Sequence, residues 1–164
     1  MARLTAERLR ELLNYCPETG VFTWRIKPCS RISVGAVAGS ASHGYLEISI
    51  ESERFLAHRL AWLYTHGVWP AFQIDHLNGQ RSDNRIANLR DVEPRINCQN
   101  QRKAKGDNKL SGRLGVYFDR GSQKWRPKIQ VDGKQIYGGS YASVDEAASA
   151  YIELKRQHHV GCTI

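Results

Sequence analysis

The sequence has no long apolar run and no cysteine pair at the spacing of a metal or disulfide site. Among its 164 residues no stretch of about 18 apolar residues occurs, which excludes a membrane-spanning helix. The first residues lack the apolar segment of a secretory signal. The cysteines form no C-x-x-C pair, so they indicate neither a zinc site nor a disulfide framework; they are Cys16, Cys29, Cys98 and Cys162. We therefore expect free thiols in a reducing cytoplasm.

Negative charge is scarce as well. The chain holds 24 Lys and Arg against 16 Asp and Glu, a formal net charge of +8. Such an excess favours a polyanionic partner, because the release of counterions drives phosphate binding. Charge alone leaves a merely basic surface equally open. At this length the chain has room for one full domain or two small ones.

The first 71 residues alternate between helical and extended patterns. Leu9, Leu12 and Leu13 form an apolar stripe at helical spacing, which predicts a short helix with Thr5 as its N-cap. The further expected elements are a strand at 21–24, a short strand near 36–38, a hairpin of 45–50 and 55–57, and a helix from His58 to about Thr65.

A different pattern follows from Phe72. It predicts a strand at 72–76, a long polar loop at 77–88, a strand at 89–92 and a helix at about 94–102. Residues 102–113 (RKAKGDNKLSGR) then carry five basic residues and one acidic residue with almost no apolar content. This composition is typical of a linker, and we place the domain boundary within it.

The last segment predicts three strands and a closing helix. The strands are expected at 115–119, 124–131 and 134–141, with Asp132-Gly133 as a hairpin turn. Ser143 and Glu146 form a capping box, and the apolar stripe of the helix consists of Val144, Ala147, Ala148, Tyr151 and Leu154. The fold class is thus α+β: a small mixed N-terminal region, a ββα motif, then a three-stranded antiparallel sheet packed on one helix.

The pair Asp75-His76 carries the chemistry that phosphodiester hydrolysis needs. At the end of a strand, a carboxylate can hold a cation while the neighbouring imidazole activates water. Histidine suits the base, because an unperturbed pKa of about 6.5 leaves it largely neutral. A second oxygen ligand must come from elsewhere, and Asn97 lies early in the expected helix. Asn88 closes the loop and can brace its backbone, while Arg85 can touch phosphate.

Each of these residues also has a plainer interpretation. An isolated Asp-His pair is more often a surface hydrogen bond than a catalytic site, so the whole spacing pattern is needed. His58 begins a largely apolar helix, which favours a core or supporting role over catalysis. The pair His158-His159 is expected to be solvated, with metal capture as a minor alternative.

The spacing D-H-x-x-G-(x)8-N-L-(x)7-N, from Asp75 to Asn97, resembles the HNH signature of phage homing endonucleases. Residues 57–62 (AHRLAW) and 17–22 (PETGVF) resemble that family too, so the similarity covers most of residues 4–103. The resemblance implies a ββα-metal core at about 72–103 of a nuclease domain at 1–103. It makes Asp75 and Asn97 ligands of one divalent cation, Mg²⁺ or Mn²⁺. It makes His76 the general base and Asn88 the residue that orders the loop. Asn97 in place of the frequent histidine disfavours zinc, since an amide is a poor zinc ligand.

Residues 114–164, beyond a basic linker at 104–113, resemble the APETALA/ethylene-response-factor DNA-binding domain. The motifs that carry the resemblance are Gly115-Val116-Tyr117, Lys124-Trp125, Gly133-Lys134, Gly138-Gly139-Ser140-Tyr141, Glu146-Ala147-Ala148 and Ala150-Tyr151. That family lays its sheet in the major groove of DNA, which is wide enough for a β surface. One face of the middle strand is basic and the other apolar, and Trp125 on the apolar side is expected in the core. Arg85 is one DNA-binding candidate. The others, from the linker and this domain, are Arg102, Lys103, Lys105, Lys109, Arg113, Tyr117, Arg120, Lys124, Arg126, Lys128, Gln130 and Gln135.

The sequence therefore predicts a metal-dependent endonuclease of the HNH homing type that nicks or cuts double-stranded DNA. Its site would be selected by the C-terminal domain. We expect a monomer without membrane association, encoded by a phage or prophage and acting in the cytoplasm of a bacterial host. One alternative is a sequence-specific DNA-binding regulator whose nuclease half is inactive. A second is a nonspecific or RNA-directed nuclease, which the appended DNA reader disfavours.

Overall fold

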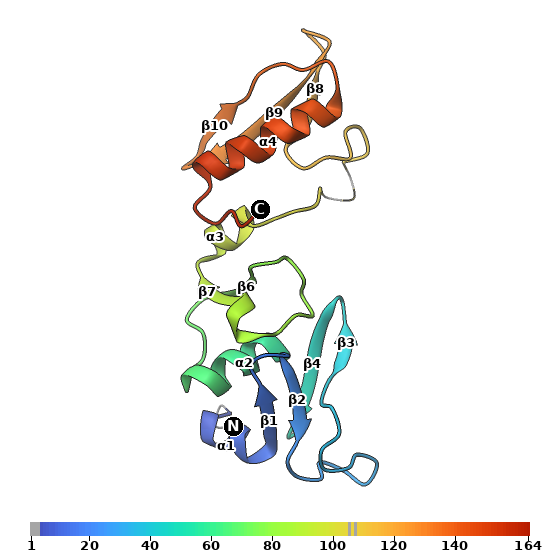
Figure 1. Cartoon of the computed structure of the whole chain (residues 1–164), viewed down its shortest axis with the longest axis vertical. Helices are drawn as coiled ribbons and strands as arrows, with labels where there is room; N and C mark the ends of the chain where they lie inside the picture. Colours follow the sequence, from blue (N-terminus) through green and yellow to red (C-terminus); the bar gives the residue numbers. More distant parts are fainter. Residues whose placement is uncertain (1–3, 105, 107) are drawn as a thin grey trace. The chain divides into compact units, whose positions relative to one another are not determined.

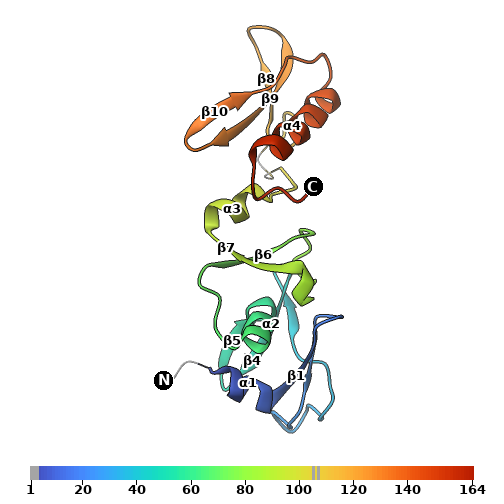
Figure 2. The ribbon, with the colours of Figure 1, turned by 60° about the vertical axis from the view of Figure 1, so that its left-hand side comes forward.

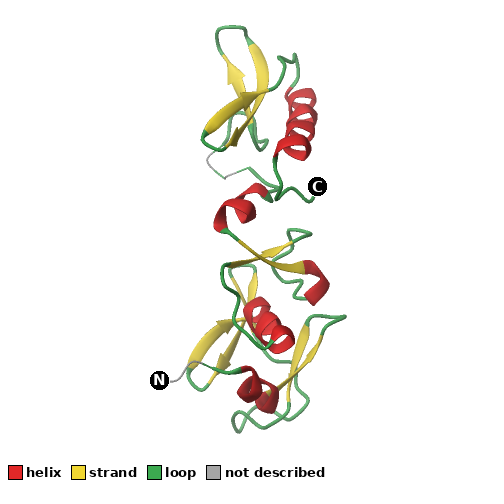
Figure 3. Ribbon diagram, turned by 90° about the vertical axis from the view of Figure 1, so that its left-hand side faces the viewer, coloured by secondary structure: helices red, strands yellow, loops and turns green. Residues whose placement is uncertain are grey.

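The computed structural model describes residues 4–104, 106 and 108–164. Its secondary structure mixes helices with several small antiparallel sheets (Figure 3). The chain divides into two compact units, residues 1–94 and 95–164. The division falls before the expected linker at 104–113, so α3 (Pro94–Gln99) lies almost wholly in the C-terminal unit.

The N-terminal unit opens with α1 (Ala6–Leu12), whose N-cap Thr5 accepts a hydrogen bond from the backbone of Arg8 at 3.2 Å. The predicted cap is therefore confirmed, but the helix ends one residue before Leu13. That leucine begins β1 (Leu13–Cys16), which pairs with β2 (Val21–Trp24) and sets Leu13 opposite Trp24. The helical assignment of Leu13 was wrong, because a fully buried leucine fits either a helix stripe or a strand face.

The middle of this unit is a three-stranded sheet with a helix against it. Its strands, in the order β3-β4-β5, are β3 (Ser40–Ser42), β4 (Tyr45–Ile50) and β5 (Glu53–Leu56). The expected strand near residue 37 is reduced to one isolated bridge between Thr23 and Val37. Directly after β5 comes the predicted helix α2 (Ala57–His66), which ends at Gly67 in the left-handed conformation. Figure 1 shows α2 beside the β1–β2 hairpin and β4.

The long loop lies between two short paired strands. These are β6 (Gln73–His76) and β7 (Leu89–Val92), with the 3₁₀ turn η1 (Ile86–Asn88) leading into β7. The expected first strand starts one residue later than predicted, because Phe72 is exposed and its backbone N–H bonds to the Asp91 carboxylate at 2.9 Å instead. A single apolar core joins the elements of this unit, including Leu9, Phe22, Ile48 and Leu60.

The C-terminal unit is a three-stranded antiparallel sheet with a helix on one side (Figure 2). Its elements are β8 (Val116–Asp119), β9 (Lys124–Val131), β10 (Lys134–Tyr137) and α4 (Val144–His158). Ser143 and Glu146 make both bonds of the predicted capping box. The last strand stops at Tyr137, four residues earlier than predicted. Gly138 and Gly139 follow, and glycine weakens a strand interior.

The end of the chain returns to α3, and this explains why that helix lies with the C-terminal unit. The backbone of Gly161 donates to the side chain of Gln99 at 2.9 Å, and Thr163 donates to Asn100 at 2.5 Å. Lys155 of α4, almost fully buried, donates to the carbonyl of Gln101. Among the described residues, no helix is both long and apolar enough to cross a membrane.

Candidate active site around His76

Asp75 and His76 occupy the last two positions of β6. The register places Asp75 opposite Arg90 and His76 opposite Leu89 of β7. Arg90 contacts Oδ2 of Asp75, with Nε at 2.9 Å and Nη2 at 2.7 Å. A buried carboxylate needs a counter-charge, and Arg90 supplies it. The strand pair therefore holds a fixed carboxylate directly before the histidine.

The imidazole of His76 is 5% exposed and lies among three neighbours from other elements. The ring of His58, on α2, is 5.1 Å away edge-to-face, and the ring of Tyr45, on β4, is 6.2 Å away. The side-chain oxygen of Asn84 lies 3.4 Å from His76 Nε2. Burial lowers the pKa of His76, although the Asn84 bond and the charge of Asp75 act the other way. The lowered pKa favours the neutral imidazole, the form that a general base requires.

His58 is buried beside His76 rather than in the apolar core alone. Its Nδ1 has no hydrogen-bond partner, and Tyr45 contacts its ring with centroids 5.3 Å apart. Burial lowers the pKa of His58 to about 3, with the nearby His76 as a second cause. The sequence favoured a core or supporting role for this residue, and the structure places it against the candidate base. Tyr45 was missed, because an alternating strand carries no signal that one of its rings faces an active site.

The loop between the strands is braced by Asn88. Its side-chain oxygen accepts from the backbone of Asn78 at 2.9 Å, and its side-chain nitrogen donates to the carbonyl of Asp83 at 2.8 Å. The Asp83 carboxylate is paired in turn with Arg85 at 2.6 Å, and this bond lowers the pKa of Asp83 to about 2. Asn88 thus contacts both arms of the loop. Arg85 is exposed, so its guanidinium could exchange Asp83 for a phosphate.

The N-terminal hairpin supports the same loop from outside the strand pair. The Tyr15 hydroxyl donates to the carbonyl of Asn84 at 2.7 Å, and the backbone of Ile86 donates to Pro17 at 3.4 Å. Gly20, with φ +73°, lies so close that a Cβ there would be 2.5 Å from the Arg85 nitrogen. Residues 17–20 are therefore part of the support of the site.

The donor set determines which cation the site could hold. Among the described residues, no cluster of three or more His, Cys, Asp or Glu has a metal-binding arrangement. A carboxylate completed by amide oxygens, water and phosphate fits a hard ion such as Mg²⁺ and is poorly suited to zinc. Asp75 fits this description. Asn97, half-buried on α3, belongs to the C-terminal unit, so its pairing with Asp75 stays a prediction.

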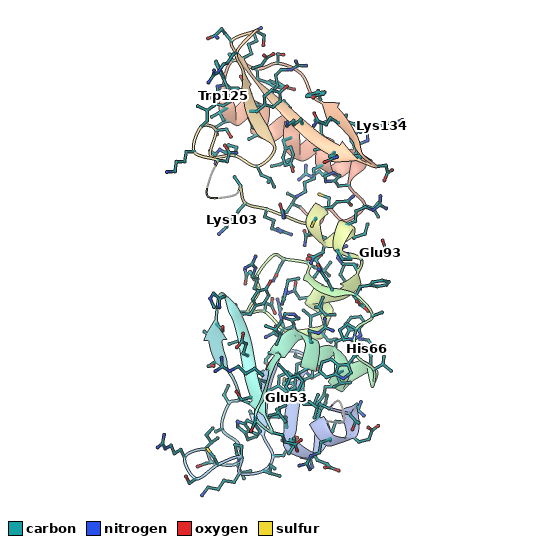
Figure 4. The ribbon with its side chains drawn as sticks, turned by 180° about the vertical axis from the view of Figure 1, so that it is seen from behind. Glu53, His66, Glu93, Lys103, Trp125 and Lys134 are labelled. Carbon is teal, nitrogen blue, oxygen red and sulfur yellow. The ribbon has the colours of Figure 1, made fainter. Side chains whose placement is uncertain are left out.

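The cations of the expected linker are mostly exposed, and several are engaged. Arg102 donates to Thr163, and Arg113 is paired with Asp145 of α4 at 2.6 Å. Lys103, labelled in Figure 4, and Lys109 are exposed, whereas Lys105 lies outside the described residues. The two paired arginines would have to give up their present partners to contact phosphate, whereas the exposed lysines are open to solvent.

The strand register gathers cations and tyrosines on the side of the C-terminal sheet that faces away from α4. Tyr117 pairs with Arg126 across β8 and β9, and Lys128 pairs with Tyr137 across β9 and β10. Lys128 lies 5.1 Å from the Tyr117 ring. The other predicted residues of this unit are all exposed: Arg120, Lys124, Gln130 and Gln135. We call this set, with Tyr117, Arg126, Lys128 and Tyr137, the sheet face.

The opposite side of the sheet carries the small core of this unit. Val116, Ile129, Ala147 and Tyr151 form a buried cluster against α4. Trp125, also labelled in Figure 4, is half-buried and packs on this cluster, with its ring 5.0 Å from Phe118. The predicted division of β9 into a basic and an apolar side is thereby confirmed.

The comparisons with known proteins agree with this location of the chemistry. Residues 55–99 match the family model of the HNH endonucleases. The matched segment includes His58, Asp75, His76, Asn88 and Asn97, and it ends before the C-terminal sheet. Neither the curated proteins nor the solved structures gave a match to the chain. An HNH endonuclease segment is therefore present at residues 55–99, and it implies nuclease activity on DNA.

Proposed function

We propose that this protein is a metal-dependent DNA endonuclease of the homing type, with His76 as the general base. The observation that carries the proposal is the buried imidazole of His76 beside the Asp75 carboxylate, in a segment that matches the HNH endonucleases. The proposed setting is the cytoplasm of a bacterial host, with the gene carried by a phage or prophage. We propose that the protein acts as a monomer on double-stranded DNA.

The side chains would share the reaction as follows. His76 accepts a proton from a water molecule, and the oxygen of that water attacks phosphorus. The bond from phosphorus to the leaving sugar oxygen breaks, and that oxygen takes a proton from solvent. Asn88 holds the loop in place, and Arg85 contacts a phosphate oxygen once it leaves Asp83. His76 then returns its proton to solvent.

Asp75 and Asn97 are the proposed holders of one divalent cation, Mg²⁺ or Mn²⁺. Such an ion would stabilise the negative charge that develops at the phosphate and the leaving oxygen. Arg90 contacts Oδ2 of Asp75 through both Nε and Nη2, which keeps the carboxylate oriented as a ligand must be.

The C-terminal unit is proposed to select the cleavage site. Its sheet face combines at least three cations with two tyrosine rings, a composition that suits phosphate and base contacts in a major groove. We also propose that this unit binds DNA in the way that its resemblance to the APETALA/ethylene-response-factor domain implies. Two weakly binding modules on one chain raise each other's effective concentration, so a weakly specific nuclease could be directed to a chosen sequence.

A plasmid-nicking assay tests the proposal. The wild-type protein should nick supercoiled DNA with Mg²⁺ and not with EDTA, and Asp75→Asn should be inactive with Mg²⁺. As a matched control, Asp145→Asn removes another arginine-paired carboxylate, on α4, and should nick normally. Nicking that persists in EDTA would refute the metal dependence. DNA binding without any nicking by the wild type would favour the inactive DNA-binding protein instead.

A further inference from the structure

The side-chain amide of Asn84 lies against Nε2 of His76. Asn84 is 1% exposed, and its side-chain oxygen lies 3.4 Å from that nitrogen. The bond is long, as catalytic hydrogen bonds often are before substrate binds. The bond joins the loop between β6 and β7 to the end of β6, so a residue outside the strand orients the imidazole.

This contact has a consequence for where the proton of His76 resides. A neutral imidazole carries one N–H, and the other nitrogen keeps its lone pair. An amide oxygen only accepts hydrogen bonds, so with the Asn84 oxygen facing His76 the contact is a hydrogen bond when Nε2 carries the proton. The lone pair then remains on Nδ1. In metal sites and catalytic triads, the partner of one ring nitrogen fixes the role of the other in the same way.

The backbone of Asn84 is held more firmly than a loop residue usually is. Tyr15 donates to its carbonyl at 2.7 Å, and the absent side chain of Gly20 leaves room for it: a Cβ on Gly20 would be 2.5 Å from the Asn84 carbonyl carbon. Both supports come from β1, β2 and their turn, outside residues 55–99. Because its backbone is held and its side chain is buried, the Asn84 amide can keep its oxygen directed at His76.

The amide nitrogen of Asn84 and Nδ1 of His58 both lack a hydrogen-bond partner, although both are buried around His76. An unsatisfied buried polar atom is costly, so keeping the amide here requires a compensating role. The reversed amide is the competing arrangement. It would donate from nitrogen to Nε2 and leave the proton on Nδ1.

We infer that Asn84 is a positioning residue that fixes His76 as the Nε2–H tautomer, so that Nδ1 is the nitrogen that accepts the proton of the attacking water. The second half of this inference rests on the proposed nuclease function, whereas the tautomer does not. The role reaches beyond the matched segment, because Tyr15 and Gly20 hold Asn84 in place.

The test reads the tautomer directly on the full chain. Ring ¹⁵N chemical shifts of His76 are measured by long-range proton–nitrogen correlation in protein with ¹⁵N-labelled histidine, in EDTA. Assignment uses the signal lost in His76→Gln. The wild type should show a protonated Nε2 and an unprotonated Nδ1. Asn84→Ala should shift His76 to a mixture of tautomers, and Asn84→Asp, which keeps an acceptor, should restore Nε2–H.

The same variants are compared for nicking. Asn84→Ala should nick about 10- to 100-fold more slowly, and Asn84→Asp should recover part of the rate. Asn100→Ala removes another buried amide, in the C-terminal unit, and should change neither the tautomer nor the rate. If Asn84→Ala fails to fold, Asn84→Asp and the wild-type spectrum still decide the question.

The inference is overturned if wild-type His76 is protonated at Nδ1, or if Asn84→Ala leaves the tautomer unchanged. A wild type with the expected tautomer but without nicking activity would refute the nuclease proposal and leave the positioning role of Asn84 supported. The spectrum therefore tests the tautomer and the nicking assay tests the nuclease proposal, and either claim can be refuted without the other.

Discussion

The two units of this protein carry their functional side chains in opposite ways. In the N-terminal unit, Asp75, His76 and His58 are each less than a tenth exposed and are held by neighbours from several elements. In the C-terminal unit, Lys124 and Lys128 project from a sheet whose core is small. A reacting group needs one orientation and a dry environment, whereas phosphate contacts tolerate many geometries. Changes in the first unit should therefore act all-or-none, and changes in the second should act in small steps.

The largest effect should come from His76→Ala. Removal of a general base typically lowers the rate about 10²- to 10⁴-fold, and we expect about 10³-fold in the nicking assay. DNA affinity, measured by fluorescence anisotropy, should change little, because the imidazole is buried and the proposed DNA contacts are made by exposed cations. His66→Ala is the control, since that histidine is exposed at the end of α2 (Figure 4) and its ring lies on that of Trp62, with centroids 4.1 Å apart. Wild-type nicking by His76→Ala would exclude this residue as the base.

The next largest effect should come from Gly20→Ala. The new Cβ would meet the backbone of Asn84 and Arg85 at 2.5 Å, at a φ of +73° that disfavours any side chain. Strain and overpacking together should lower the free energy of unfolding by about 3 kcal/mol, measured by urea denaturation. Gly35→Ala separates the two causes, because Gly35 has φ +84° and nothing within 4 Å of the added Cβ. It should lose only about 1 kcal/mol. Equal losses in the two variants would show that close packing of the β1–β2 turn against residues 84 and 85 adds nothing to the cost.

A smaller effect should appear in the pH dependence of stability. Burial lowers the pKa of His58 to about 3 in the folded protein, against about 6.5 for an unperturbed histidine. The unfolded chain therefore binds more protons between these values. The contribution to stability is full above about pH 6.5 and is lost as pH falls toward 3. Between about pH 7.5 and pH 5 this should cost about 2 kcal/mol in urea denaturation with EDTA present.

His58→Phe should remove most of that pH dependence, because a ring of similar size replaces the titrating group. The lowered pKa of His76 acts in the same direction, so part of the slope should remain. A slope that is identical in wild type and His58→Phe would contradict the assignment of the slope to His58.

The smallest single effects should come from the sheet face. Lys128→Ala removes a cation that lies over Tyr117, and DNA affinity should fall several-fold. The slope of log affinity against log salt should decrease by about 1, the value for one lost phosphate contact. Arg156→Ala, on α4 and paired with Glu153, is the control and should leave both quantities unchanged. If Lys128→Ala binds like the wild type at every salt concentration, the sheet face is not the DNA-binding surface.

The sequence determined the parts of this protein that depend on neighbours along the chain. The spacing from Asp75 to Asn97 located the candidate chemistry, and alternation along β9 separated basic from apolar side chains, because a strand turns successive residues to opposite faces. Capping by Thr5 and Ser143 was readable for the same reason: each bond spans three residues.

Only the tertiary structure decided what surrounds His76. Tyr45, His58 and Asn84 come from β4, α2 and the loop, and no local pattern signals that their side chains meet around one imidazole. The strand β1 was hidden for a similar reason, since a buried Leu13 fits two periodicities and its partner Trp24 lies eleven residues away. Burial, and with it the lowered pKa of His76, is a sum over such distant contacts, which is why the sequence could name a candidate base but not its environment.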